Sequence, residues 1–165
     1  MNQQRLKDLQ ENLDLLYEKL GMFEQEITIC ANANQKFELK QRIKKEIIPP
    51  IKRYEVEFWE IIAQDAGVYF ENTDEQTATE VLATLQSEVT AIERVNSSTS
   101  SNEVMEILRD MRAKLNEPEA SASAKLKGTI PLVPLLLSCE VELDIEKFLF
   151  NKVLQPLRRK LLRLR

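Results

Sequence analysis

Basic side chains close to the C-terminus are the part of the sequence best suited to binding chemistry. They are Arg158, Arg159, Lys160, Arg163 and Arg165, and leucines are interleaved with them. Guanidinium and ammonium groups in such a row bind carboxylates or phosphates, and the leucines give the segment an apolar side. This combination is typical of a helix that lies on a membrane surface or docks in the groove of a partner.

The rest of the chain carries the opposite charge. Residues 145–165 hold seven of the 23 Lys and Arg residues and one of the 27 acids, which gives a net charge of about +6. Residues 1–144 hold the other 16 bases and 26 acids, about −10, although the whole chain has a net charge of only −4. Two interpretations stay open: the tail closes on the acidic body of its own chain, or it binds an external anionic surface.

A second candidate surface is an apolar run that contains two prolines, Pro131 and Pro134. Its other residues include Leu132, Val133 and Leu135. We expect this run at the tip of a turn, and its apolar side chains form an interaction patch if the tip is exposed. The alternative is that helices cover the run.

Several sequence features on which much enzyme chemistry depends are missing. Histidine is absent, which removes the usual general base and the commonest catalytic zinc ligand. No glycine-rich phosphate loop, zinc spacing or EF-hand loop is present, and the carboxylates fall on polar helix faces. We therefore expect no catalytic, cofactor-binding or metal-ligating residues, no cofactor and no enzymatic activity. Cys30 and Cys139 are expected to be buried thiols in a reducing cytoplasm, and a disulfide or a reactive thiol is the alternative.

Composition predicts a mainly α fold. The 165 residues match one domain, and the 43% apolar and 30% charged fractions are those of a globular protein. Three glycines and 6% aromatic residues are few for an all-β fold. We expect no signal peptide, because the first 20 residues are charged throughout and lack an apolar run, and the apolar run 130–138 is too short to span a membrane. We expect a single domain over 1–165 in the cytoplasm, peripheral to a membrane if the tail binds lipid.

Residues 1–66 are expected to form a long antiparallel helical hairpin. Apolar residues recur at steps of three and four in the first helix: Leu6, Leu9, Leu13, Leu16, Leu20, Phe23, Ile27 and Cys30. A turn at Asn32-Ala33-Asn34 leads to a second helix, which bends at Pro49-Pro50 and resumes. Its stripe is Phe37, Ile43, Ile47, Ile51, Tyr54, Phe58 and Ile62.

Residues 73–116 are expected to form two further helices. The first covers 74–95 with a capping box of Thr73 and Gln76, and the second begins at a capping box of Ser100 and Glu103. A linker over 116–124 follows.

Residues 124–165 are expected to form a small β-hairpin and the basic terminal helix. Apolar and polar residues alternate in 125–130 and again in 137–143. Folding these runs together pairs Lys125 with Glu142 and Lys127 with Glu140, so opposite charges face each other across the strands.

Three stretches of the sequence resemble a helical module of cyanobacterial multidomain proteins. They are Leu16-Tyr17-Glu18-Lys19-Leu20-Gly21, residues 36–43 (KFELKQRI) and Ile130-Pro131-Leu132-Val133-Pro134. In those proteins the module precedes NACHT-type NTPase, WD-repeat, caspase-like or other effector domains. The resemblance implies an adaptor role in a signalling or defence assembly, and it implies no catalytic residues.

The sequence as a whole predicts a non-catalytic protein–protein interaction module. Its expected partner is a protein, either its own chain or a larger signalling protein. The alternative is an effector that acts on an anionic membrane surface through the basic tail and the apolar hairpin tip. Nucleic acid is not expected as a partner, because the acidic body would repel phosphates and few aromatic residues accompany the basic ones.

Overall fold

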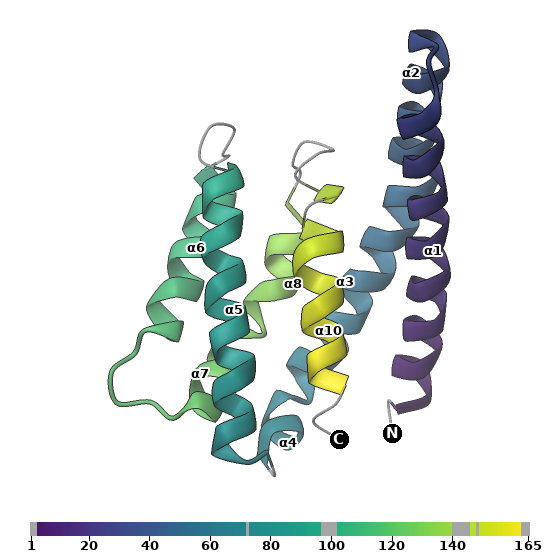
Figure 1. The fold of residues 1–165 in the computed structure, drawn as a ribbon. Helices are drawn as coiled ribbons and strands as arrows, with labels where there is room; N and C mark the ends of the chain where they lie inside the picture. The colour runs from purple at the N-terminus through teal and green to yellow at the C-terminus, as the bar shows by residue number, and fades with distance from the viewer. Residues whose placement is uncertain (1–2, 72, 97–101, 140–145, 148, 163–165) are drawn as a thin grey trace. The chain divides into compact units, whose positions relative to one another are not determined.

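Most of the part of the chain that the structure describes is helical. This computed structural model describes all residues except 1–2, 72, 97–101, 140–145, 148 and 163–165. The described residues contain no strand, and the predicted mainly α fold class is confirmed (Figure 1). The chain divides into two compact units, Met1–Phe58 and Trp59–Arg165, which are described separately below. The single domain expected for residues 1–165 stays a prediction.

The first unit is a helical hairpin, as the spacing of its apolar residues predicts. Its elements are α1 (Gln3–Ile29), α2 (Ala33–Arg42), a π-helical turn η1 (Ile43–Ile47) and the first part of α3 (Ile48–Gln64). The chain reverses at Asn32, whose side-chain Oδ1 accepts hydrogen bonds from the backbone N–H groups of Asn34 (2.8 Å) and Gln35 (3.4 Å). Asparagine at this position satisfies two of the otherwise unpaired N–H groups at the start of α2. Figure 1 shows α2 beside the C-terminal end of α1.

One face of α1 packs into the core of this unit. Its buried side chains are Leu6, Leu9, Leu13, Tyr17 and Leu20, and the returning helix of the hairpin contributes Ile43, Ile47, Ile48, Ile51 and Phe58. Leu6, Leu9, Leu13 and Leu20 of the expected seam are buried, as predicted. The prediction is wrong for its other members, which are only half-buried: Leu16, Phe23, Ile27 and Cys30. Tyr17 takes the inward position: it lies slightly more than one helical turn after Leu13, and its hydroxyl reaches Glu55 of α3.

The second helix continues through Pro49-Pro50, and a wider turn directly precedes the two prolines. The Ile48 N–H donates to the Ile43 carbonyl, five residues back, where an α-helix would use a residue four back. A proline has no N–H to donate, and its ring clashes with the carbonyl four residues before it. The π-helical turn holds the carbonyls ahead of the prolines in a wider ring, and α3 continues from Ile48.

A buried hydrogen bond joins α1 to α3 in this unit, and its removal should destabilise the protein. The Tyr17 hydroxyl donates to Glu55 Oε1 at 2.7 Å, and the Glu55 side chain is fully buried. Tyr17→Phe withdraws a donor from a buried carboxyl, so we expect it to lower the free energy of unfolding by about 1–3 kcal/mol. Denaturant unfolding followed by circular dichroism measures the change. Tyr54→Phe is the matched control on the half-buried tyrosine of α3 and should change it by less than about 0.5 kcal/mol.

The second unit is a bundle of shorter helices around α5. Helix α5 contacts α6, α7 and α10, and α6 runs antiparallel beside it (Figure 1). Besides the last part of α3, the elements are α4 (Ala66–Glu71), α5 (Glu75–Asn96), α6 (Asn102–Leu115), α7 (Ala122–Thr129), α8 (Leu132–Leu137), a π-helical turn η2 (Leu149–Leu154) and α10 (Gln155–Leu162). Its core takes side chains from every one of these elements, with Trp59, Phe70 and Phe150 the largest aromatic ones.

The β-hairpin expected near the C-terminus is wrong where the structure describes it. Residues 125–130, the expected first strand, lie in α7 and the turn after it, and Leu137 of the expected second strand ends α8. Residues 140–145 lie outside the described part. Leu126, Ile130 and Val133 are buried at steps of four and three, which is a helical pattern, although the step of four within 125–130 also fits an alternating one. Contacts of α7 with α4, α5 and α6 bury this face, and a short segment with both periods follows its surroundings.

The cap at the start of α5 makes stability depend on pH. The Thr77 hydroxyl and backbone N–H donate to Asp74 at 2.7 and 2.8 Å and hold the pKa of this carboxyl below its usual value. Asp74, rather than the expected pair Thr73 and Gln76, is therefore the cap. Because the pKa is lowered on folding, the cap stabilises the protein above the unfolded pKa of about 4 and loses this effect as pH falls through the folded pKa.

We therefore expect Asp74→Ala to melt at a lower temperature than the parent chain at pH 7. The difference should shrink as the pH is lowered below about 4, and thermal melts across this pH range measure it. Asp74→Asn is the matched variant, because an asparagine caps without ionising and should remove the pH dependence while it retains most of the stability. A constant difference between Asp74→Ala and the parent chain at all pH values would contradict the assignment.

Candidate interaction surfaces

The basic tail is packed against its own unit as far as the structure describes it. Helix α10 contacts α5, and Leu157, Arg158 and Leu161 are buried. Arg159 and Lys160 are exposed. The remaining two candidates, Arg163 and Arg165, lie outside the described residues. The structure thus brings part of the predicted basic segment to the surface and places Arg158 inside the unit.

Lys160 is oriented toward α5 and not away from the unit. Its Nζ donates to Thr84 Oγ1 at 2.7 Å. Burial raises the pKa of the Glu88 carboxyl, one turn further along α5, and the positive charge of Lys160 acts in the opposite direction. The hydrogen bond joins the basic tail to Thr84 of α5, and the charge of Lys160 also acts on Glu88 of the same helix.

The apolar run with two prolines is mostly covered. Val133 and Pro134 are buried, Leu132 is half-buried, and Leu135 is 55% exposed. Pro131 is the N-cap of α8 and Pro134 lies in the first turn of this helix, where a missing N–H costs little. Of the three candidate residues in this run, Leu135 alone is largely open to solvent.

Most of the exposed large apolar side chains lie on the hairpin of the first unit. Among the described residues these side chains are Leu15, Met22, Ile29, Phe37 and Leu135, and all but Leu135 belong to this unit. Leu15, Met22 and Ile29 follow one another at seven-residue steps on α1 and are 64%, 59% and 83% exposed. A seven-residue step is nearly two helical turns, so the three form one row on the side of α1 opposite its buried face. We call this row the outer stripe.

Carboxylates line the outer stripe. Glu11, Glu18 and Glu26 each lie three or four residues from a member of the stripe, and all three are exposed. Between residues 8 and 29, α1 carries six acids and a single base, Lys19. The outward side of α1 therefore combines an apolar row with a negative charge of several units.

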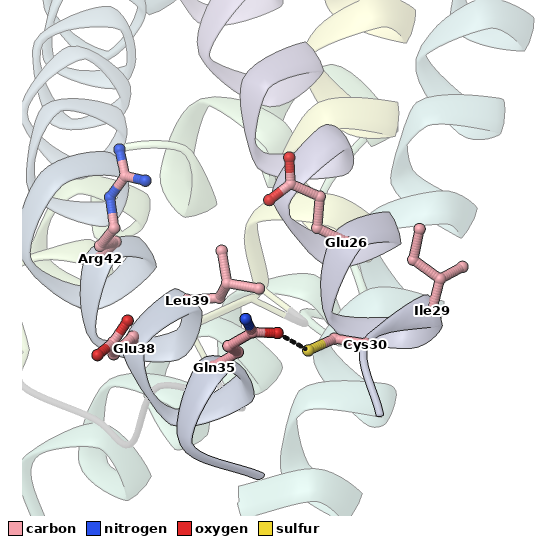
Figure 2. Close-up of a pocket in the computed structure, with 7 residues that line it drawn as sticks. All are labelled: Glu26, Ile29, Cys30, Gln35, Glu38, Leu39 and Arg42. Atoms are coloured by element: carbon pink, nitrogen blue, oxygen red, sulfur yellow. Dashed lines mark hydrogen bonds between the residues drawn. The ribbon is translucent and has the colours of Figure 1, made fainter. Parts of the chain in front are cut away.

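The outer stripe ends at an open groove between the tips of the two helices of the hairpin. The groove has a volume of about 380 Å³, and Ile29, Cys30, Gln35 and Leu39 form much of its lining. Figure 2 shows Leu39 and Gln35 on the side of α2 that faces α1, and the Cys30 thiol donates to Gln35 Oε1 at 3.2 Å. We call it the tip groove.

The rim of the tip groove is charged. Glu26, Glu38 and Arg42 surround the opening (Figure 2). Arg42 is held within its own unit, because it pairs with Glu46 at 3.4 Å and its guanidinium lies 4.8 Å from the centre of the Phe23 ring. The two carboxylates remain available to a partner at the entrance of a partly apolar groove.

Few side chains are buried at the tip of the hairpin. Helix α2 buries none of its side chains, and Phe37, which the sequence assigns to the apolar stripe of the second helix, is 63% exposed. Exposed apolar surface of this kind at the end of a helical hairpin is typical of a site where another protein binds. The seven-residue spacing of Leu15, Met22 and Ile29 is visible in the sequence, and a search for a second periodic row on the first helix would have found it.

Other features of the described residues are less suited to a binding site. A second cavity of about 250 Å³ lies between α5 and α6, and Arg112 on its wall pairs with Glu93. No cluster of acidic and cysteine side chains in the described part could hold a metal ion. Neither Cys30 nor Cys139 forms a disulfide. The described helices include none with the length and apolar content to cross a membrane.

The outer stripe and the tip groove thus both belong to the hairpin of the first unit. The stripe is an apolar row with carboxylates beside it, and the groove at its end has two carboxylates at its rim.

In comparisons with known proteins, no family model, no curated protein and no solved structure matched this chain.

Proposed function

We propose that this protein is a non-catalytic protein–protein interaction module that docks through the helical hairpin of its first unit. The observation that carries this proposal is the outer stripe, which leaves Leu15, Met22 and Ile29 exposed in one row on α1. Isolated apolar side chains on a surface are ordinary, but an ordered row is typical of a surface that another helix covers. An adaptor role in a signalling or defence assembly agrees with the resemblance of the sequence to effector-associated helical modules.

Site-specific photocrosslinking tests this proposal. A photoreactive phenylalanine derivative replaces Met22 in one variant and Leu135 in another, and each is irradiated in a lysate of cells that naturally produce the chain. We expect a discrete protein adduct at position 22, identified by mass spectrometry and abolished by Leu15→Glu. The same yield of the same adducts at positions 22 and 135, or no adduct at position 22, would contradict the proposal.

The alternative, a membrane-surface effector that acts through the basic tail, has less support. Leu157 and Leu161 pack inside the second unit, so the apolar side of α10 is not open to lipid. Lys160 donates to a hydroxyl of its own unit. Co-sedimentation with vesicles that contain phosphatidylserine tests the alternative: binding that Arg159→Glu with Lys160→Glu abolishes would favour it over the interaction module.

A further inference from the structure

We infer that the occupant of the outer stripe is a basic amphipathic helix of another protein. Its apolar residues would lie on Leu15, Met22 and Ile29, and its lysines or arginines would lie on the neighbouring carboxylates of α1. This inference rests on the proposed function, because it names the kind of partner that the interaction module binds.

The spacing along α1 fits a helical partner. Leu15 and Ile29 are fourteen residues apart, about 21 Å along the helix axis, so a partner must run for about four turns to contact the whole stripe. Leu15, Glu18, Met22, Gln25 and Ile29 alternate at steps of three and four, which is the spacing at which one helix packs along another. The tip groove beyond Ile29 has room for one apolar side chain at the end of such a helix.

The charge pattern selects the chemistry of the partner. The exposed carboxylates of Glu11, Glu18 and Glu26 border the stripe, and Glu38 adds another at the rim of the tip groove. Complementary charge favours a partner with lysines or arginines at these places, and it raises the rate of encounter as well. The exposed Lys19 also borders the stripe, but the three carboxylates outnumber it, so an acidic helix or an anionic membrane would meet net repulsion.

The same charges disfavour a second copy of this chain. In a parallel pairing along the stripe, Glu18 would face Glu18 of the other copy. In an antiparallel pairing centred on Met22, Glu18 would face Glu26. Like charges at such facing positions are destabilising in both orientations.

The basic helix of this chain, α10, already has its apolar side buried. Leu157 and Leu161 of α10 are buried within the second unit, so the apolar side of that helix is not available to a stripe on α1. Helix α10 is therefore not the occupant.

Two synthetic helical peptides of equal length test the inference. One has leucines at steps of three and four with lysines elsewhere, and the other has glutamates in place of the lysines. Binding to the full chain is measured by fluorescence anisotropy at physiological ionic strength. We expect the lysine peptide to bind at least about tenfold more tightly than the glutamate peptide.

Two pairs of variants locate the binding. Met22→Glu, or Ile29→Glu if the first variant is not folded by circular dichroism, should weaken binding of the lysine peptide at least about tenfold. Leu135→Glu is the matched control on an exposed leucine of the second unit and should leave the binding unchanged. The triple variant Glu11→Lys, Glu18→Lys and Glu26→Lys should prefer the glutamate peptide. The triple variant Glu103→Lys, Glu106→Lys and Asp110→Lys makes the same charge change on exposed residues of α6 and should keep the original preference.

Several results would overturn the inference. The first is failure of the lysine peptide to bind, and the second is equal loss in the α1 and α6 triple variants, which would indicate non-specific charge attraction. A dimer in sedimentation velocity that Met22→Glu dissociates would identify a second copy as the occupant. Vesicle binding that Met22→Glu abolishes would identify a membrane. A photocrosslinked partner at position 22 whose capture does not depend on the three glutamates would leave the proposed function intact and reject the basic helix.

Discussion

Leu13→Ala is expected to lower the free energy of unfolding by about 2–5 kcal/mol, the range for truncation of a buried leucine. Leu13 is fully buried on the inward face of α1, in the core of the hairpin. The substitution removes apolar contact and leaves a cavity that neighbouring side chains fill only in part. Denaturant unfolding followed by circular dichroism measures the loss.

Leu15→Ala is the matched control, with the same chemical change two residues further along the same helix. Leu15 is 64% exposed, so its truncation should change the free energy of unfolding by less than about 0.5 kcal/mol. Helix propensity changes equally in the two variants, and their difference therefore reports burial alone. Equal losses for Leu13→Ala and Leu15→Ala would contradict the assignment of inward and outward faces on α1.

Arg158→Ala is expected to lower the free energy of unfolding by about 2–4 kcal/mol, a large effect for a residue in a basic tail. The Arg158 side chain is fully buried beside Leu157 and Leu161, in a helix that contacts α5. Its long apolar stem fills space in the unit, and truncation leaves that space empty. Because the side chain is buried, added salt should change this loss very little.

Arg159→Ala is the control for this prediction, with the same change at the next residue. Arg159 is exposed, so the free energy of unfolding should change by less than about 0.5 kcal/mol. Arg158→Met separates packing from charge, because methionine restores much of the apolar volume without the guanidinium. If Arg158→Ala is as stable as Arg159→Ala, the packing of α10 on α5 is not what the structure indicates.

The sequence alone was enough to predict the helices whose apolar residues repeat over several turns. In α1 the row from Leu6 to Leu20 extends over four turns, and a run of this length has one helical face and no comparable strand pattern. The turn at Asn32 was predictable for a local reason, because a side-chain oxygen next to the first turn of a helix is enough to cap it. The sequence also separates the acidic body from the basic tail, since charge needs no structure to be counted.

The tertiary structure decided what local patterns left open. Residues 125–130 fit an alternating pattern and a helical one, and packing of α7 against three helices selected the helix. Whether Leu16 or Tyr17 faced inward depended on the partner helix, and so did the burial of Arg158 and the exposure of Arg159. The outer stripe is the clearest case. The spacing of its residues is visible in the sequence, but their exposure follows from the fact that only one face of α1 is packed. Until the neighbouring helices are known, a periodic row of leucine, methionine and isoleucine is equally typical of a buried core.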